Sequence, residues 1–333
     1  MKMRTWPARS AVALAMALTT GFGVDAGYAQ ADRSAPFPTH AIKIVVPFPA
    51  GGPTDVNIRI IAQRMGEDWR VPVVIENRPG ANTAIGAQAV ARAEPNGYTL
   101  LAAMDQTLVM NPAAATGPLS YDPLNDFAAI TLTAKNTSLL TVRASDGPRT
   151  VKELIARGKA GRLTYGAGIV ITRLAGYLFG QFAGIDLQFI PYKGSSDVVQ
   201  GLLSGSVDFI VDGAAPSLPL IKSGQFRALA KLNSRPLSQL PDLEPLAIAA
   251  GLPQLDDMSS WIGLVAPART PQPVIDKIHQ EVVSIYNDAA VVDRLDKAGI
   301  SPVTSTPAEF DAFFRSEALR WAKVFRDSGI RLD

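Results

Sequence analysis

The stretch "IVVPFPAGGPTDVNIRIIAQRM" (Ile44 to Met65) joins an apolar run to a helical pattern through a loop with three prolines and two adjacent glycines. The order strand, glycine loop, helix places backbone N–H groups at a helix N-terminus, where unpaired donors and the helix dipole favour an anion. We therefore expect this loop to contact a ligand, and its residue types indicate which kind.

The loop differs from a phosphate-binding loop. No Lys or Arg lies between Pro47 and Asn57, and the prolines have no N–H to donate. The amides that remain belong to Phe48, Ala50, Gly51, Gly52 and Thr54. Because a stiff loop loses little entropy on binding, these features predict a site for a small, weakly charged group such as one carboxylate.

A purely structural interpretation of the loop stays open. The two glycines would then only make the turn, and Thr54 would only cap the following helix. Asp55 supports this alternative, since a carboxylate in the first helical turn satisfies the helix dipole and would repel a second anion.

From Ile42 onward, short β-branched runs alternate with helical patterns. Strands are expected at 42–48, 71–77, 98–104, 187–192, 207–213 and 227–233, and helices at 54–65, 84–93, 172–184, 196–205 and 216–224. Several of the strands are apolar without alternation, as expected when both faces of a sheet are covered. The pattern indicates an α/β fold with a largely parallel sheet covered by helices.

The last third of the chain is strongly helical. Thr270 and Pro271 start a helix through 274–286, Gly299 is a later stop signal, and Thr306 to Glu309 form a capping box. Aromatic and apolar residues then recur at helical spacing on one face, which we expect to be buried in a core: Phe310, Phe313, Phe314, Trp321, Val324 and Phe325.

Two extended stretches, 128–134 and 258–268, are candidate crossovers between two α/β domains. If both cross, domain 1 comprises 32–133 plus 260–333, and domain 2 is the inserted segment 134–259. Two linking strands of this kind make a hinge over a ligand cleft.

Residues 1–31 have the features of a signal peptide. Lys2, Arg4 and Arg9 form a basic region, 11–20 is an apolar run too short to span a bilayer comfortably, and Ala29 or Ala31 fits a cleavage site. A membrane anchor or a disordered tail is the alternative. After cleavage we expect a soluble exported protein.

Charge and cysteine content exclude several classes of function. Removing the signal peptide takes away three of the 32 basic and one of the 30 acidic residues, which leaves 29 of each. This balance argues against nucleic acid and against an anionic membrane surface as partners. Because the chain has no cysteine, disulfides, thiolate metal sites and lipid attachment through a cysteine are excluded.

The chain lacks the common catalytic signatures. It has no G-x-S-x-G, H-E-x-x-H or P-loop motif, and its two histidines, His40 and His279, have no histidine or cysteine neighbour. We expect no catalytic residue, metal or cofactor. A secreted hydrolase or isomerase stays open as the alternative, with its acid or base drawn from Asp55, Asp105, Lys193 and Asp212.

Three further loops, 104–107, 165–173 and 191–197, occupy strand-to-helix positions. Loops at the carboxyl ends of strands face one crevice in open α/β sheets, so these loops are expected to converge on one small molecule. Arg173 is the most specific candidate, because a guanidinium can pair bidentately with a carboxylate. Its alternative role is a solvated charge on a helix.

The chain resembles the Bug, or TctC-like, solute-binding proteins of tripartite tricarboxylate transport systems. The resemblance covers nearly the whole chain after residue 31 and is carried by "KIVVPFPAGGPTDVNIRIIAQRM", "VVIENRPGANTAIGAQAVARAEPNGYTLL", "YDPLNDFAAITL", "IPYKGSSDVVQGLLSGSVDFIVDGAAPSLPLIKSGQFRALA", "SSWIGLVAPARTPQPVIDKIHQEV" and the ending "WAKVFRDSGIRLD".

The resemblance implies a periplasmic-binding-protein type II-like fold, in which two α/β domains joined by crossover strands close on a small carboxylate or related metabolite. It also implies a monomer in the periplasm that presents its ligand to membrane transporter subunits, with a receptor-linked sensor as the other option. The candidate ligand-binding residues are Phe48, Ala50, Gly51, Gly52, Thr54, Asp55, Gln106, Thr107, Ala167, Gly168, Thr172, Arg173, Tyr192, Lys193, Gly194 and Asp212.

The sequence departs from the family pattern where specificity is expected to be set. The stretch "YGAGIVITRLAGYLF" has no serine and places Arg173 where family members commonly have a histidine, and Tyr177 replaces a usual glutamate. Asp105-Gln106 also differs from the small pair common in the family. The resemblance therefore predicts the fold and the class of function without identifying the ligand.

Overall fold

The computed structural model describes residues 37–115, 117–192 and 194–328, which all belong to one compact unit. The predicted signal peptide lies outside the described residues, and so does Lys193. None of the helices in these ranges is long and apolar enough to cross a membrane.

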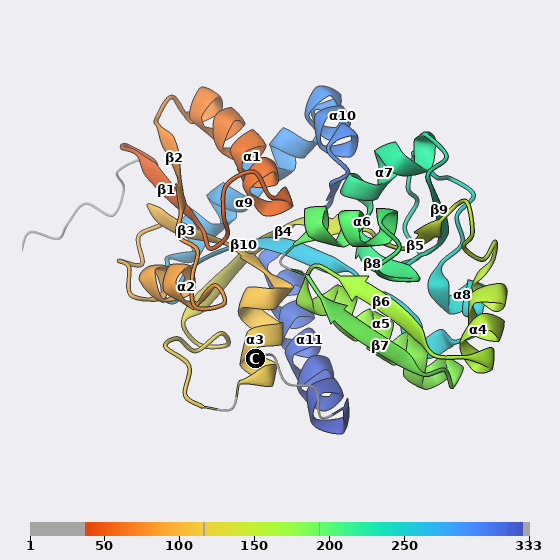
Figure 1. The fold of residues 1–333 in the computed structure, drawn as a ribbon. Coiled ribbons are helices and arrows are strands. Elements are labelled where there is room, and N and C mark those ends of the chain that lie inside the picture. Colours follow the sequence, from red (N-terminus) through yellow and green to blue (C-terminus); the bar gives the residue numbers. More distant parts are fainter. Residues whose placement is uncertain (1–36, 116, 193, 329–333) are drawn as a thin grey trace, which may run out of the picture. The chain divides into compact units, whose positions relative to one another are not determined.

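The first sheet has six strands in the described part of the chain. They are β1 (Ile42–Val46), β2 (Val73–Asn77), β3 (Thr99–Met104), β4 (Phe127–Asn136), β10 (Ser260–Pro267) and β11 (Ser301–Pro302), in the order β11-β4-β10-β3-β1-β2 (Figure 1). β1 pairs in parallel with β2 and β3, whereas β10 runs antiparallel to both β3 and β4. The sheet is therefore mixed, and the expectation of a largely parallel sheet was wrong, because the crossing strand β10 lies between β3 and β4 and runs opposite to both.

The second sheet has five strands among the described residues. They are β5 (Ser138–Arg143), β6 (Leu163–Ala167), β7 (Leu187–Pro191), β8 (Phe209–Gly213) and β9 (Phe226–Lys231), in the order β7-β6-β8-β5-β9. β6 is parallel to β7 and β8, and β5 is antiparallel to β8 and β9. Both sheets thus contain three adjacent parallel strands followed by one strand, β10 or β5, that runs antiparallel to both of its neighbours.

The helices lie on the faces of the two sheets. They are α1 (Pro53–Trp69), α2 (Ala84–Ala91), the π-helix η1 (Gln106–Met110), α3 (Asn111–Ala114), α4 (Val151–Ala160), α5 (Val170–Ala183), α6 (Ser195–Leu203), α7 (Ala214–Lys222), α8 (Leu246–Ala250), the 3-10 turn η2 (Pro253–Leu255), α9 (Gln272–Tyr286), α10 (Ala289–Lys297) and α11 (Pro307–Ser328). Each predicted strand and helix is confirmed within a few residues. The elements that were not predicted are β5, β6, α4, α8 and α10 and the short β11, η1, α3 and η2.

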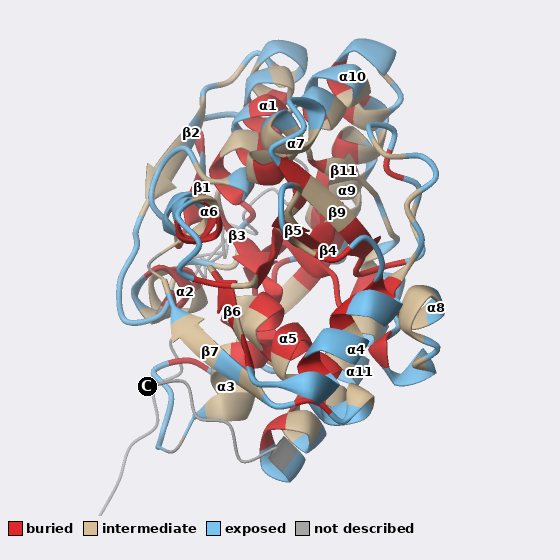
Figure 2. Ribbon diagram, turned by 45° about the vertical axis from the view of Figure 1, so that its right-hand side comes forward, coloured by how far each residue is buried: buried red, intermediate tan, exposed pale blue. Residues whose placement is uncertain are grey.

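The period-two pattern of β1 explains how both faces of the first sheet are buried. Ile42, Ile44 and Val46 pack with residues of α1, α9 and α10, whereas Val45 joins a second cluster with α2 and α11. Figure 2 shows the buried strands at the centre and exposed helix faces outside.

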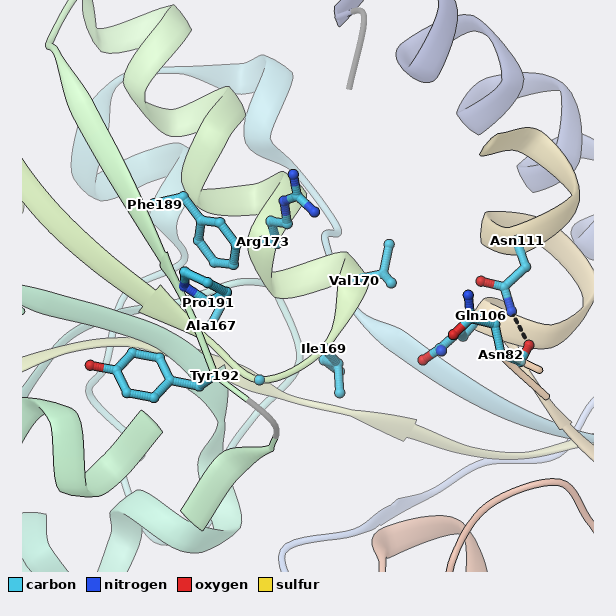
Figure 3. A pocket seen from close by; sticks show the side chains of 11 residues that line it. Asn82, Gln106, Asn111, Ala167, Ile169, Val170, Arg173, Phe189, Pro191 and Tyr192 are labelled. Atoms are coloured by element: carbon cyan, nitrogen blue, oxygen red, sulfur yellow. Dashed lines mark hydrogen bonds between the residues drawn. The ribbon is translucent and has the colours of Figure 1, made fainter. Parts of the chain in front are cut away.

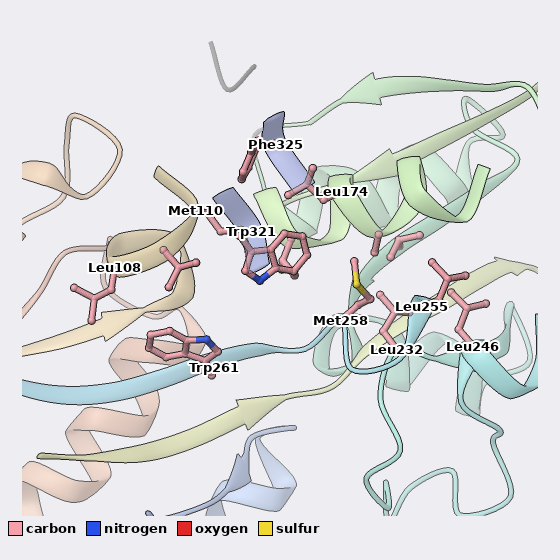
Figure 4. Close-up of a cluster of buried hydrophobic side chains, with 14 of the residues drawn as sticks. Leu108, Met110, Leu174, Leu232, Leu246, Leu255, Met258, Trp261, Trp321 and Phe325 are labelled. Atoms are coloured by element: carbon pink, nitrogen blue, oxygen red, sulfur yellow. The ribbon is translucent and has the colours of Figure 1, made fainter. Parts of the chain in front are cut away.

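One apolar core extends from the first sheet to the second. The predicted aromatic face of α11 is confirmed as core, with Phe310, Phe314, Trp321 and Phe325 at most 5% exposed. Trp321 and Phe325 lie in the same cluster as Leu174 of α5 and Met258 before β10 (Figure 4). The capping box that starts α11 is also confirmed, since Thr306 Oγ1 accepts from the Glu309 amide at 3.2 Å.

The chain passes between the sheets at two places. Only Thr137 separates β4 from β5, and the return runs from β9 through α8 and η2 to β10. The Asn233 side-chain amide donates to Thr137 Oγ1 at 3.2 Å and to Ser259 Oγ at 2.7 Å, and all three residues are buried. These hydrogen bonds connect the two passages. The domain boundaries given above stay a prediction.

Candidate ligand-binding cleft

A cavity of about 520 Å³ lies between residues of the two sheets, within the size range of small-molecule sites. Its described lining contains no Asp, Glu, Lys, Arg or His. The lining residues are Phe48, Pro49, Ala50, Gly52, Pro53, Thr54, Met104, Gln106, Asn136, Thr137, Ser138, Gly168, Ile169, Gly194, Ser195, Ser196, Gly213, Ala214, Ala215, Pro216, Ser260, Ala298 and Gly299.

The N-termini of four helices meet at this cavity. Gly52 precedes α1, Ile169 precedes α5, Gly194 precedes α6 and Gly213 precedes α7, and all four residues line it. Each helix N-terminus has backbone N–H groups without intrahelical acceptors and the positive end of the helix dipole. The cavity is therefore suited to an anion although none of its described lining residues is charged.

The floor of the cavity is built from the passages between the sheets. Asn136, Thr137, Ser138 and Ser260 line it, and they belong to the end of β4, the start of β5 and the start of β10. The Asn136 side-chain oxygen is buried and has no hydrogen-bond partner among the described residues. A ligand on this floor would contact both passages between the two sheets.

The loop before α1 has a fixed geometry. Gly51 has a φ of +86°, which favours glycine, and its amide donates to Asp55 Oδ2 at 2.9 Å. Gly52 is the N-cap, so Thr54 lies inside the first turn of α1 and does not cap the helix. Phe48, Ala50, Gly52 and Thr54 line the central cavity, whereas Gly51 lines an adjoining cavity of about 540 Å³.

Asp55 lies behind this loop and lines none of these cavities. Its carboxylate accepts from Gly51 N, from Arg59 Nε at 2.8 Å and from Asn77 Nδ2 at 2.9 Å. Burial raises the pKa of Asp55, but the hydrogen bonds from Arg59, Gly51 and Asn77 lower it by more, and the pKa lies below its ordinary value. Arg59 thereby neutralises the carboxylate that was expected to repel a bound anion.

Two other candidate carboxyl groups are buried beneath the cavity wall. Asp105 accepts from Ser260 Oγ at 2.9 Å, and burial raises the pKa of its carboxyl group to about 7. Asp212 is 1% exposed, and neither carboxyl oxygen has a hydrogen-bond partner of good geometry among the described residues. Burial raises the pKa of Asp212 to about 6.

Arg173 lies outside the central cavity, in a side pocket of about 220 Å³ (Figure 3). The pocket and the central cavity share Gln106, Gly168 and Ile169. Ala167, Arg173 and Tyr192 line only the side pocket, and the Arg173 guanidinium lies 4.8 Å from the centre of the Phe189 ring.

The remaining predicted site residues have other positions. Thr107 is a fully buried residue of η1, and its side-chain oxygen has no partner among the described residues. Thr172 Oγ1 donates to the Ile169 carbonyl at 2.9 Å, and it thus fixes the start of α5 from inside. The Tyr192 ring packs against Gly166 and Gly201, and Gly194 lines the central cavity as predicted.

Sequence reasoning missed several lining residues. The floor residues Asn136, Thr137, Ser138 and Ser260 lie in the predicted crossovers or directly beside them, which was an available signal. Gly213 to Pro216 follow a predicted strand and start a predicted helix, as the recognised loops do. No group of three or more His, Asp and Glu among the described residues is placed to hold a metal ion.

Comparison with known proteins identifies relatives over nearly the whole chain. A protein of Pseudomonas sp., described as the UPF0065 protein in the tcbD-tcbE intergenic region, is 33% identical over 93% of this chain and 91% of its own length. Protein BugT of Bordetella pertussis is 30% identical over 93% of this chain and 96% of its own length.

Solved structures share the fold. A periplasmic transporter has a TM-score of 0.78 at 34% identity, over 89% of this chain and all of the other. An R. palustris protein solved with adipate has a TM-score of 0.78 at 29% identity, over 89% of this chain and 99% of the other. MatC of Rhodopseudomonas palustris, with bound malate, has a TM-score of 0.72 at 28% identity, over 86% and 99% of the two chains.

These matches confirm the resemblance that the sequence motifs indicated. They favour a solute-binding role over a secreted hydrolase, an isomerase or a ligand-sensing protein, because the structural neighbours are solute-binding proteins. The model of the tripartite tricarboxylate transporter family receptor, TctC, matches residues 57–330. The chain therefore belongs to the TctC, or Bug, family of solute-binding proteins.

Proposed function

We propose that this protein captures a small carboxylate in the cavity between its two sheets, in the periplasm, and presents it to the membrane subunits of a tripartite tricarboxylate-type transporter. The four helix N-termini at a cavity whose described lining residues are all uncharged carry this proposal. Two relatives of known structure hold adipate and malate, which are both dicarboxylates.

The neutral lining favours a carboxylate over a phosphate. Backbone amides and hydroxyl groups such as those of Thr54 and Ser195 bind one negative charge well, while a multiply charged phosphate group is usually held by Lys or Arg as well. Because no cation lines the cavity among the described residues, release of the ligand does not require breaking an ion pair with any of them.

The two sheets are proposed to act as lobes that close on the ligand. The ligand would contact α1 of one lobe, α5 to α7 of the other and the floor between them. Its binding energy would then favour the closed arrangement, which a membrane partner can distinguish from the open one. Export through cleavage of residues 1–31 is part of the same proposal.

A thermal-shift screen tests the function. The purified protein is heated with mono- and dicarboxylates, and each acid is compared with its neutral amide of equal length. A true ligand stabilises the folded state by about 2.7 kcal/mol at a hundredfold excess over Kd, whereas its amide has little effect. If no carboxylate raises the melting temperature, the proposed function is wrong.

Mass spectrometry of the bound compound then separates binding from catalysis. Asp55, Asp105 and Asp212 do not line the cavity, so we expect the ligand to be recovered unchanged after prolonged incubation. Conversion of the compound would instead support the hydrolase or isomerase alternative.

A further inference from the structure

The side pocket beside the central cavity has a distinct chemistry. It is lined by Arg173 and the Phe189 ring on the wall formed by the second sheet, and by the amides of Asn82, Gln106 and Asn111 on the facing wall (Figure 3). No carboxylate lines it within the described part of the chain. Among the described residues, the central cavity has no charged lining side chain, whereas this pocket has the positive charge of Arg173.

The Arg173 guanidinium is available to bind an anion. It is partly buried, lies over the face of Phe189 at 4.8 Å, and makes no ion pair with any described carboxylate. Its backbone is held by Tyr165, whose hydroxyl donates to the Arg173 carbonyl at 2.9 Å. Stacking on an aromatic ring orients a guanidinium while leaving its N–H donors available.

The side pocket adjoins the central cavity. Gln106, Gly168 and Ile169 line both cavities, so one molecule can occupy both. Its volume of about 220 Å³ suits one end of a small ligand. The Asn111 amide donates to the Asn82 carbonyl and to Thr83 Oγ1 at 3.4 Å, and these bonds brace the wall that faces Arg173.

We propose that Arg173 binds the second carboxylate of a dicarboxylate whose first carboxylate lies at the helix N-termini of the central cavity. This inference rests on the proposed function and names the class of ligand. Arg173 would therefore set specificity for a diacid over a monoacid, and it would not be the anchor for the first carboxylate.

Isothermal titration with matched ligands tests the proposal. The probes are α,ω-dicarboxylates from malonate to sebacate, each compared with its own monomethyl ester, which keeps one carboxylate and the chain length. In the wild-type protein the best diacid is expected to bind at least about tenfold more tightly than its ester. Arg173→Gln should lose this preference by weakening only the diacid, while Arg173→Lys should keep part of it.

Arg162→Gln is the matched control, because Arg162 belongs to the same half of the molecule and forms an exposed ion pair with Asp186 at 3.4 Å. The Arg162→Gln variant should bind the diacid and the ester as tightly as the wild type does. Circular dichroism melting of each variant confirms that it is folded.

The outcomes separate this inference from the proposed function. If the wild type binds a carboxylate but Arg173→Gln keeps the full preference for diacids, the inference is wrong and the proposed function stands. The same holds if diacid and ester bind equally, or if only monoacids bind. If the wild type binds no carboxylate, both are wrong.

Discussion

Asp212 shows how a single side chain can oppose folding and the binding of an anion at neutral pH. It is buried at the end of β8, and Gly168, Ser195 and Gly213 around it line the ligand cavity. An ionised carboxylate there has no ion-pair partner among the described residues. A protonated Asp212 is therefore better suited both to the fold and to a bound carboxylate.

We expect the contribution of Asp212 to stability to fall as pH rises. The pKa of Asp212 is raised to about 6 by burial, so the folded state binds its proton more tightly than the unfolded state, where the pKa is about 3.9. The contribution is fully present below about pH 4 and is lost as pH rises through about 6. Asp212→Asn removes this loss and should be more stable than the wild type at pH 7.5 by about 1 to 3 kcal/mol.

Urea unfolding at pH 4.5 and pH 7.5 measures this difference. The gain of Asp212→Asn over the wild type should be much smaller at pH 4.5. Asp242→Asn, at an exposed position, is the control and should match the wild type at both values. An Asp212→Asn protein that is less stable than the wild type at pH 7.5 would mean that the carboxylate has a partner that stabilises it.

At the scale of elements, the loop before α1 depends on an ion pair whose carboxylate is buried, and α11 contains a counterpart whose carboxylate is exposed. In α1, Arg59 Nε donates to Asp55 Oδ2 at 2.8 Å, and in α11, Arg315 Nε donates to Asp311 Oδ2 at 2.8 Å, with the same spacing of four residues. The Asp55 side chain is 3% exposed, whereas that of Asp311 is 40% exposed. The pairs thus differ mainly in burial and in the two extra donors to Asp55.

Asp55→Asn is expected to destabilise the protein by about 1 to 3 kcal/mol at pH 7, because it weakens three hydrogen bonds to a buried acceptor. Asp311→Asn should change the unfolding free energy by less than about 0.5 kcal/mol. The pKa of Asp55 lies below its ordinary value, so the difference between wild type and Asp55→Asn is present at neutral pH and should shrink as pH falls below about 4. Urea unfolding of all three proteins at pH 7 and pH 3.5 checks this, and equal effects of the two substitutions at pH 7 would contradict it.

Elements whose ends carry capping or turn residues were in general easier to predict from the sequence than elements without such residues. The capping box at Thr306 and the glycine loop before α1 marked their helices correctly. β5 was missed because only Thr137 separates it from β4, without a turn residue to mark the change of sheet. α4 had a usable signal, since Thr150 Oγ1 accepts from the Glu153 amide at 3.1 Å in a T-x-x-E capping pattern.

The candidate site could be predicted loop by loop but not side chain by side chain. The position of a loop follows from strand order, so Phe48, Gly52, Gln106 and Gly194 line the cavity as expected. Whether a side chain such as that of Asp55 faces the cavity or lies behind the wall depends on its partners, which come from distant segments such as Asn77. A pattern along one segment does not contain that information.

For the whole molecule, one edge of the cleft is joined by hydrogen bonds between the two halves. Ser238 Oγ donates to Asp296 Oδ2 at 2.7 Å, and Gln239 Nε2 donates to the same carboxylate oxygen at 3.3 Å. Leu237 packs with residues of β5 and α7, whereas Leu295 of α10 packs with the first sheet. Nearby, Gly299 approaches Ala215 so closely that a Cβ on Gly299 would lie 2.7 Å from that of Ala215.

If the halves move as lobes, these contacts stabilise the closed arrangement, and weakening them should lower ligand affinity. We expect Asp296→Ala to weaken binding of the carboxylate found in the thermal-shift screen about two- to fivefold. The two exposed hydrogen bonds that it removes contribute about 0.5 to 1 kcal/mol to closure. The apparent Kd rises because the closed fraction falls. Asp293→Ala is the control, since Asp293 lies on the same helix and pairs only with Lys297 of α10 among the described residues. Small-angle scattering should show a larger radius of gyration for ligand-free Asp296→Ala than for the wild type, and saturating ligand should remove the difference. Equal affinity and equal radius for Asp296→Ala, Asp293→Ala and the wild type would show that this edge does not open.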